Sequence, residues 1–214
     1  MQKILKHTLY IFLFIFVATA LITFAGVFKL WFLDGDPSKL TYLDGFVAAV
    51  ITEVTAIIIA FAKTGLKYLP EVITNKNEDE TLDFMKRFID SGSSVTIVSN
   101  RVAWLRKGHT IIEEIKEMAQ AGSALEIITP LEVEEEVMTL LKASGVNFYF
   151  TNEKQAPEAR FTLVNGNRSG AERLAIAKGV YPDHEITIFD NHSGPQIIAM
   201  AKDIIRKSKE LANA

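Results

Sequence analysis

Residues 124–150 read ALEIITPLEVEEEVMTLLKASGVNFYF, and this stretch combines two strand patterns with a helix pattern between them. Residues 124–129 and 146–150 are short and rich in β-branched and aromatic side chains, which is typical of buried strands. Pro130 opens the segment between them. The apolar residues of this segment are spaced by three and four positions, which predicts a helix: Val133, Val137, Leu140 and Leu141. The order of strand, helix and strand predicts an α/β fold with a largely parallel sheet.

The same patterns continue on both sides of this stretch. Before it, a short helix is predicted at about 80–90, a strand at 95–99 and a helix at 108–121. After it, strands are predicted at 161–164, 173–177 and 185–189, and a last helix at about 194–211. These elements predict one folded domain over residues 81–214.

Charge is distributed unevenly along the chain. Residues 1–66 hold nine of the 49 charged residues, and the other 148 residues hold forty. A uniform globule is therefore excluded. The composition predicts an apolar helical hairpin at 1–66, a connector at 67–80 and the α/β domain at 81–214.

The charge balance and the lack of cysteine exclude several classes of protein. After residue 66 the chain carries 18 basic and 22 acidic residues, which excludes a general attraction to nucleic acid or anionic lipid. A local cluster of Arg101, Arg106 and Lys107 beside Trp104 leaves nucleic acid open as a partner. Without cysteine, disulfide scaffolds, thiolate zinc sites and cysteine nucleophiles are excluded. We expect no cofactor and no metal site.

Two apolar runs predict transmembrane helices. Residues 8–27 are uncharged and long enough to cross a bilayer, and residues 46–62 form a second run. The turn at 34–45 holds three aspartates, whereas lysines flank the other ends of the runs: Lys3, Lys6, Lys63 and Lys67. By the positive-inside rule, we expect a multi-pass membrane protein with both termini in the cytoplasm and the lipid bilayer as a partner.

Glu53 lies inside the second apolar run. An ionisable group near the middle of a bilayer costs on the order of 3 kcal/mol, so it should face protein or water. One interpretation is a polar lining shared by several copies of the hairpin. The other is a protonated Glu53 that hydrogen-bonds a neighbouring helix. Both interpretations predict a homo-oligomer.

Residues 145–166 read GVNFYFTNEKQAPEARFTLVNG, and this stretch resembles the phospholipase D superfamily. In that family a strand opening with Gly-Val is followed by His-Ala-Lys-Phe-x-x-x-Asp-Gly. The same frame here runs from Glu158 through Arg160 to Asn165 and Gly166. The resemblance extends over residues 81–214, and this stretch contains one copy of the motif. It implies a mixed sheet flanked by helices, and pairing of two copies so that two motifs meet at one site.

All three chemical positions depart from the family motif. Glu158 replaces the nucleophilic histidine, and its carboxylate is a weaker nucleophile that repels a phosphodiester. Arg160 replaces the lysine and can still bind an anion. Asn165 replaces the aspartate and lacks its charge. The resemblance therefore implies the scaffold and a phosphate site without turnover. The alternative is that Glu158 and Arg160 pair with each other across the dimer.

Other residues offer further chemistry. Residues 166–170, with Arg168 and Ser169, form a polar loop that could hold a phosphate, although a plain turn explains it equally. His184 and His192 flank the strand at 185–189, which favours turn histidines over a metal pair.

The leading hypothesis is a membrane-anchored, non-catalytic phospholipase D-like protein that oligomerises and senses a phosphorylated ligand or partner. Its architecture resembles membrane effectors of bacterial antiviral defence. Ligand-binding candidates are Arg160, Asn165, Arg168 and Ser169. The alternative is a phosphodiesterase, either nuclease or phospholipase, with Glu158 and His184 as variant catalytic residues.

Overall fold

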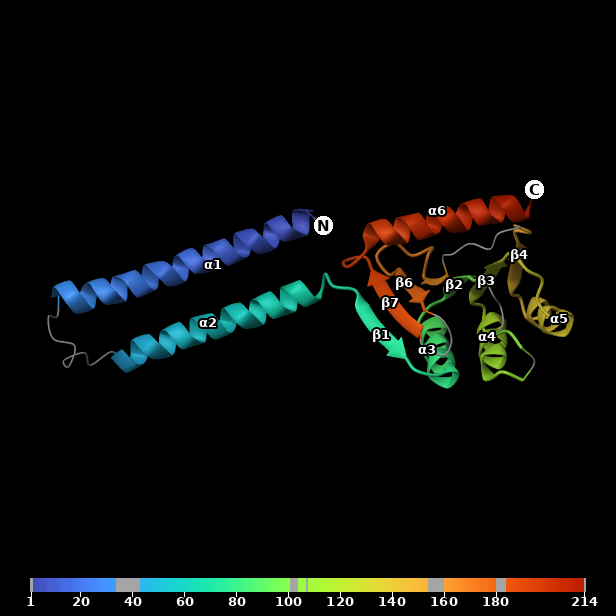
Figure 1. Ribbon diagram of the computed structural model, residues 1–214, viewed down its shortest axis with the longest axis horizontal. Helices are drawn as coiled ribbons and strands as arrows, with labels where there is room; N and C mark the ends of the chain where they lie inside the picture. Colours follow the sequence, from blue (N-terminus) through green and yellow to red (C-terminus); the bar gives the residue numbers. More distant parts are fainter. Residues whose placement is uncertain are drawn as a thin grey trace. The chain divides into compact units, whose positions relative to one another are not determined.

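The chain forms two compact units, Met1–Leu69 and Pro70–Ala214, in a computed structural model (Figure 1). The structure describes residues 2–33, 43–100, 104–106, 108–153, 160–179 and 184–213. The two units are described separately below.

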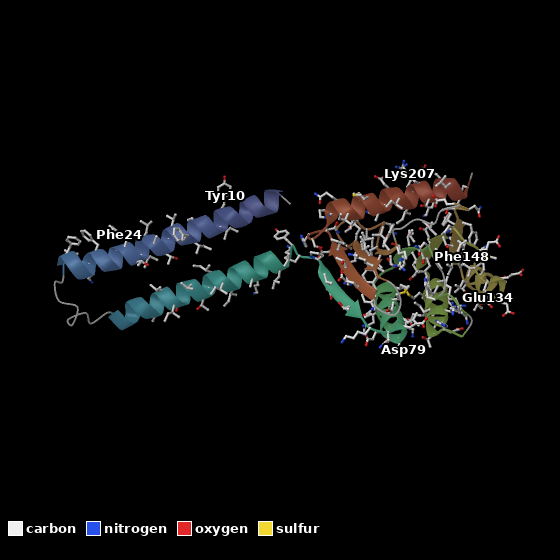
Figure 2. All side chains as sticks on the ribbon, viewed as in Figure 1. Tyr10, Phe24, Asp79, Glu134, Phe148 and Lys207 are labelled. Atoms are coloured by element: carbon white, nitrogen blue, oxygen red, sulfur yellow. The ribbon has the colours of Figure 1, made fainter. Side chains whose placement is uncertain are left out.

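The first unit is a pair of long helices. Helix α1 spans Gln2–Phe28 and continues into a π-helical turn, η1, at Lys29–Leu33. Helix α2 spans Leu43–Leu66. Both sequences lack proline in the helix interior and are rich in apolar residues, which permits unbroken helices of this length. Apolar side chains such as Tyr10 and Phe24 point outward from α1 (Figure 2).

The predicted transmembrane hairpin is wrong. In the part of the chain that the structure describes, no helix combines the length and the hydropathy that a membrane crossing needs. The prediction treated Lys3, Lys6, Asp44 and Lys63 as charges beyond the helix ends and placed only Glu53 inside the second run. The structure instead includes Lys3 and Lys6 within α1, and Asp44, Glu53 and Lys63 within α2. The predicted multi-pass membrane localisation is wrong for the same reason, and the analogy with membrane effectors of defence loses its basis.

The second unit is a seven-stranded mixed sheet flanked by helices, which confirms the predicted mixed α/β architecture of this part. The expectation of a largely parallel sheet is wrong, because four of its six strand pairs are antiparallel. Its strands are β1 (Glu71–Asn75), β2 (Ser94–Val98), β3 (Ala124–Thr129), β4 (Asn147–Phe150), β5 (Phe161–Val164), β6 (Arg173–Lys178) and β7 (His184–Asp190). Its helices are α3 (Glu78–Asp90), α4 (Thr110–Gln120), α5 (Glu135–Ala143) and α6 (Pro195–Ala212). The strand order is β1-β7-β6-β5-β2-β3-β4. Strand β1 lies within the stretch expected to be a connector.

Each face of the sheet has its own hydrophobic core. Helices α3, α4 and α5 cover one face, where Val95 and Ile97 of β2 are buried, and α6 covers the other (Figure 1). Val98 of β2 packs on the α6 side. Because side chains alternate along a strand, the two cores can be assigned to faces residue by residue.

The strand directions define two ends of the sheet. Strands β2, β3 and β4 are parallel, and β5 is antiparallel to β2. Strand β6 is antiparallel to β5, β7 to β6, and β1 to β7. Therefore β1, β6, β2, β3 and β4 all end at one side, which we call the carboxyl end, whereas β5 and β7 begin there. The opposite side is the amino end.

Candidate functional site at the carboxyl end of the sheet

Arg160 lies at the carboxyl end of the sheet, directly before β5. The antiparallel register places it level with Ser99 after β2 on one side and with Ala177 of β6 on the other. The Ala177 N–H donates to the Arg160 carbonyl across 3.1 Å. Arg160 is therefore held by sheet pairing in the middle of the sheet rather than by a free loop.

The Arg160 side chain lies on the face covered by α3, α4 and α5. Val164 is buried in the core of that face, and Arg160 shares its side of the strand by alternation. The Nη2 of Arg160 donates to the carbonyl oxygen of Gly179 across 2.9 Å. Among the described residues, no carboxylate pairs with this guanidinium. A partly exposed cation is thus fixed through one donor, and among the described residues its other donors have no partner, so they can bind an anion.

The region where β2 leads into α4 holds buried polar atoms without partners. Asn100 follows β2, and His109 is the N-cap residue of α4. Within the part of the chain that the structure describes, neither Asn100 Oδ1 nor His109 Nδ1 has a hydrogen-bond partner. The His109 side chain does not cap the helix either. Unsatisfied buried polar atoms are uncommon in folded proteins and require an explanation such as a bound group.

Asn165 and the loop after it lie at the amino end of the sheet. Asn165 has a positive φ of 56°, and its Oδ1 accepts from the Ser93 N–H across 3.1 Å. The Arg168 N–H donates to the Asn165 carbonyl across 2.9 Å, which closes the turn that also holds Ser169. These contacts give Asn165 a structural role in joining two loops.

Strand β5 separates Arg160 from Asn165. The two residues flank the strand, and a rise of roughly 3.3 Å per residue puts their Cα atoms about 16 Å apart. Arg168 and Ser169 lie beyond Asn165 at the same end. One phosphate group therefore cannot contact Arg160 and the loop of Arg168 and Ser169 together.

A second polar cluster at the amino end centres on Glu172, a residue that no local sequence pattern indicates. Glu172 is 5% exposed and accepts from Lys202 Nζ and Asn191 Nδ2, both across 2.7 Å, and from the Gly170 N–H across 2.6 Å. Burial raises the pKa of Glu172, but these hydrogen bonds outweigh it and lower the pKa to about 2. The cluster is fully paired, which indicates a structural role.

The remaining predicted residues are placed as follows. Glu158 lies outside the described residues. His184 is the first residue of β7 and pairs with Asn75 of β1 at the carboxyl end, although its side chain is not described. Glu53 lies in α2, and its side chain is likewise not described. The His192 N–H donates to Asp190 Oδ1 in a turn before α6.

The basic cluster lies only in part within the structure. Arg101 and Lys107 lie outside the described residues, whereas Arg106 accepts at its carbonyl from the His109 N–H. Trp104 packs against the core beneath α3, α4 and α5. Among the described residues, no group of three metal-ligating side chains is found.

Comparison with solved structures finds a distant similarity for part of the chain. The crystal structure of polyphosphate kinase from Porphyromonas gingivalis is similar to 64% of this chain with a TM-score of 0.46 and 14% identity. The matched part covers 23% of the polyphosphate kinase chain. No family model matches the sequence, and no curated protein is significantly similar to it.

Proposed function

We propose that the second unit is a phospholipase D-like domain that binds a phosphorylated ligand at the carboxyl end of its sheet, without turnover. Arg160 is the anion-binding residue. The observation that carries this proposal is the Arg160 guanidinium, which is anchored to Gly179 at 2.9 Å and has no carboxylate partner among the described residues. Arginine suits this role because its planar fork matches two oxygens of a phosphate.

The motif frame supports binding rather than catalysis. The position of the family nucleophile is Glu158, whose carboxylate repels a phosphodiester and is a weaker nucleophile toward phosphorus than an imidazole. The position of the family aspartate is Asn165, which is engaged with Ser93 at the amino end. Of the three chemical positions of the motif, position 160 is the one that keeps the charge of the family residue.

Titration calorimetry on the full chain tests this function. Inorganic phosphate and a nucleoside 5′-monophosphate serve as probes. Because charge-assisted hydrogen bonds are lost, Arg160→Met should weaken binding of both probes by roughly ten- to a hundredfold. Arg160→Lys should retain part of the affinity. Equal affinity of wild type and Arg160→Met, or no binding of either probe by wild type, would reject the proposal.

Arg206→Met provides the matched control. Arg206 lies on α6, on the other face of the sheet, and pairs with Asp203 and Glu210 at 3.2 and 3.1 Å. Removing this exposed charge changes the net charge of the protein by the same amount as Arg160→Met. Its affinity for the probes should equal that of wild type, because Arg206 lies away from the proposed site. An equal loss of affinity in Arg206→Met and Arg160→Met would show a general charge effect instead.

A phosphodiesterase with a variant site is the second candidate function. The observation in its favour is that His184 begins β7 at the same end of the sheet as Arg160. The test is incubation of the purified chain with bis(4-nitrophenyl) phosphate and with single-stranded DNA. Turnover that is lost in His184→Ala would support this candidate and contradict the non-catalytic proposal.

A further inference from the structure

Asn75 is a buried polar residue with an unsatisfied donor. It is the last residue of β1 and is only 5% exposed. Among the described residues, its Nδ2 has no hydrogen-bond partner. A buried amide donor without a partner costs folding free energy, because it has lost its water and gained nothing in exchange. An acceptor supplied by a ligand would remove that cost.

The position of Asn75 relates it to Arg160. Ile73 packs against the core beneath α3, α4 and α5, so Asn75, two residues further along β1, lies on the same face of the sheet as Arg160. It also lies at the same end, where it pairs with His184. The two residues therefore share one face and one end of the sheet.

The separation of the two donors follows from the sheet. The Arg160 guanidinium is bonded to Gly179, directly after β6, and β7 lies between β6 and β1. Two strand spacings of roughly 4.8 Å put the ends of β6 and β1 about 10 Å apart. A single phosphate cannot reach both donors, whereas a molecule the length of a nucleotide can.

The surroundings of Asn75 disfavour a second anion. Helix α3 begins three residues after Asn75, and its first turn holds Glu78, Asp79 and Glu80. Figure 2 labels Asp79 at this end of the helix. These three carboxylates outnumber the one neighbouring cation, Lys76, so the local charge is negative and repels a second anion. An uncharged acceptor, such as a ring nitrogen or a carbonyl oxygen, fits this position.

We infer that Asn75 determines ligand specificity by donating a hydrogen bond from Nδ2 to the base of a nucleoside 5′-monophosphate whose phosphate binds Arg160. The inference rests on the proposed function and names its ligand class. A nucleobase supplies uncharged acceptors, and the ribose separates the base from the phosphate. The cation and the neutral amide thus match the charged and the neutral end of one molecule.

Calorimetry with inorganic phosphate and the four nucleoside 5′-monophosphates tests the inference on the full chain. At least one nucleotide should bind wild type more tightly than phosphate does. In Asn75→Leu and in the smaller Asn75→Ala, that nucleotide should lose about tenfold in affinity, while phosphate binding stays unchanged. The melting temperature should stay the same or rise, because the unsatisfied amide is gone. Thr74→Val, at the exposed neighbouring position, is the control and should bind like wild type.

The outcomes separate the inference from the proposed function. If Arg160→Met weakens binding of phosphate and nucleotides but Asn75→Leu and Asn75→Ala do not weaken nucleotide binding, only the role of Asn75 fails. If none of the four nucleotides binds more tightly than phosphate, the ligand class is wrong. If both Asn75 variants melt at lower temperature and bind phosphate and nucleotide equally weakly, Asn75 is structural. If wild type binds no probe, the proposed function fails as well.

Discussion

Lys202 of α6 donates to Glu172, which directly precedes β6, across 2.7 Å. The lysine is partly exposed, whereas the glutamate side chain is 6% exposed. Glu172 also accepts from Asn191 after β7 and from the Gly170 N–H. One carboxylate thus joins α6 to two loops at the amino end of the sheet.

Glu172→Gln should lower the free energy of unfolding by about 2 kcal/mol, since hydrogen bonds to a charged group are lost or weakened in a buried site. Urea unfolding measures this as a lower midpoint with an unchanged m-value. Glu210→Gln removes an exposed partner of Arg206 and should change stability by less than about 0.5 kcal/mol. If Glu172→Gln and Glu210→Gln lower the free energy of unfolding equally, the buried position of Glu172 contributes nothing to stability.

Acid should destabilise the protein partly through Glu172. Its folded-state pKa of about 2 lies below the ordinary value of 4.5, so its contribution is fully present above pH 4.5. The contribution is lost as the pH falls from 4.5 through about 2. Asp190 acts in the same direction: burial raises its pKa, but hydrogen bonds from Ser193 and His192 lower it overall.

Unfolding free energies measured between pH 5 and 2 therefore should fall less steeply in Glu172→Gln than in wild type, because the variant has one fewer proton to bind on unfolding. Asp190 is present in both proteins and cancels in the comparison. Parallel curves for the two proteins would contradict the lowered pKa of Glu172.

Asn165 should tolerate aspartate but not alanine. Its Oδ1 accepts from the Ser93 N–H, and a carboxylate oxygen can accept the same bond. Asn165→Ala loses this bond and places a residue without a polar side chain at φ 56°, which should cost about 1 to 2 kcal/mol. Thermal unfolding of the two variants gives the comparison. A loss of phosphate affinity in Asn165→Asp would show that position 165 acts at the ligand site, against the account above.

Gly92→Ala should destabilise the second unit by about 1 to 3 kcal/mol, because a Cβ at this position overpacks the core. The added atom would lie 2.2 Å from Val164 Cγ1 and 2.8 Å from Asn165 Oδ1. Gly65→Ala, where a Cβ meets nothing within 4 Å, is the control and should unfold at or above the wild-type temperature. Equal melting temperatures of the two variants would contradict this prediction, because the loop that contains Gly92 would then move away from Val164 at no cost in stability.

Local sequence patterns predicted much of the sheet, because most strands after β1 are short apolar runs with β-branched or aromatic residues between clear turns. Strand β1 was missed. Its five residues lie between Pro70 and Asn77, and its partner β7 lies more than a hundred residues away in sequence, so pairing rather than local pattern defines it. The transmembrane prediction is wrong because α1 and α2 extend past the apolar runs and include the flanking charges, and an apolar run alone does not define where a helix ends.

The candidate site was only partly predictable. The motif frame singled out Arg160, but the nearness of Arg168 in sequence suggested a shared site that β5 rules out for a single phosphate. No local sequence pattern indicates Asn75, because its burial depends on the pairing of β1 with β7 and on the packing of α3. Glu172 depends on Asn191 and Lys202, which are 19 and 30 residues away. Such sites arise from tertiary contacts that no local spacing encodes.

The most direct test of the central claim is a crystal structure of the full chain soaked with tungstate, a heavy phosphate mimic. The anomalous signal should lie at the carboxyl end of the sheet, within hydrogen-bond distance of the Arg160 guanidinium, and should disappear in Arg160→Met. A signal at the amino end beside Arg168 and Ser169, or an undiminished signal in Arg160→Met, would contradict the account.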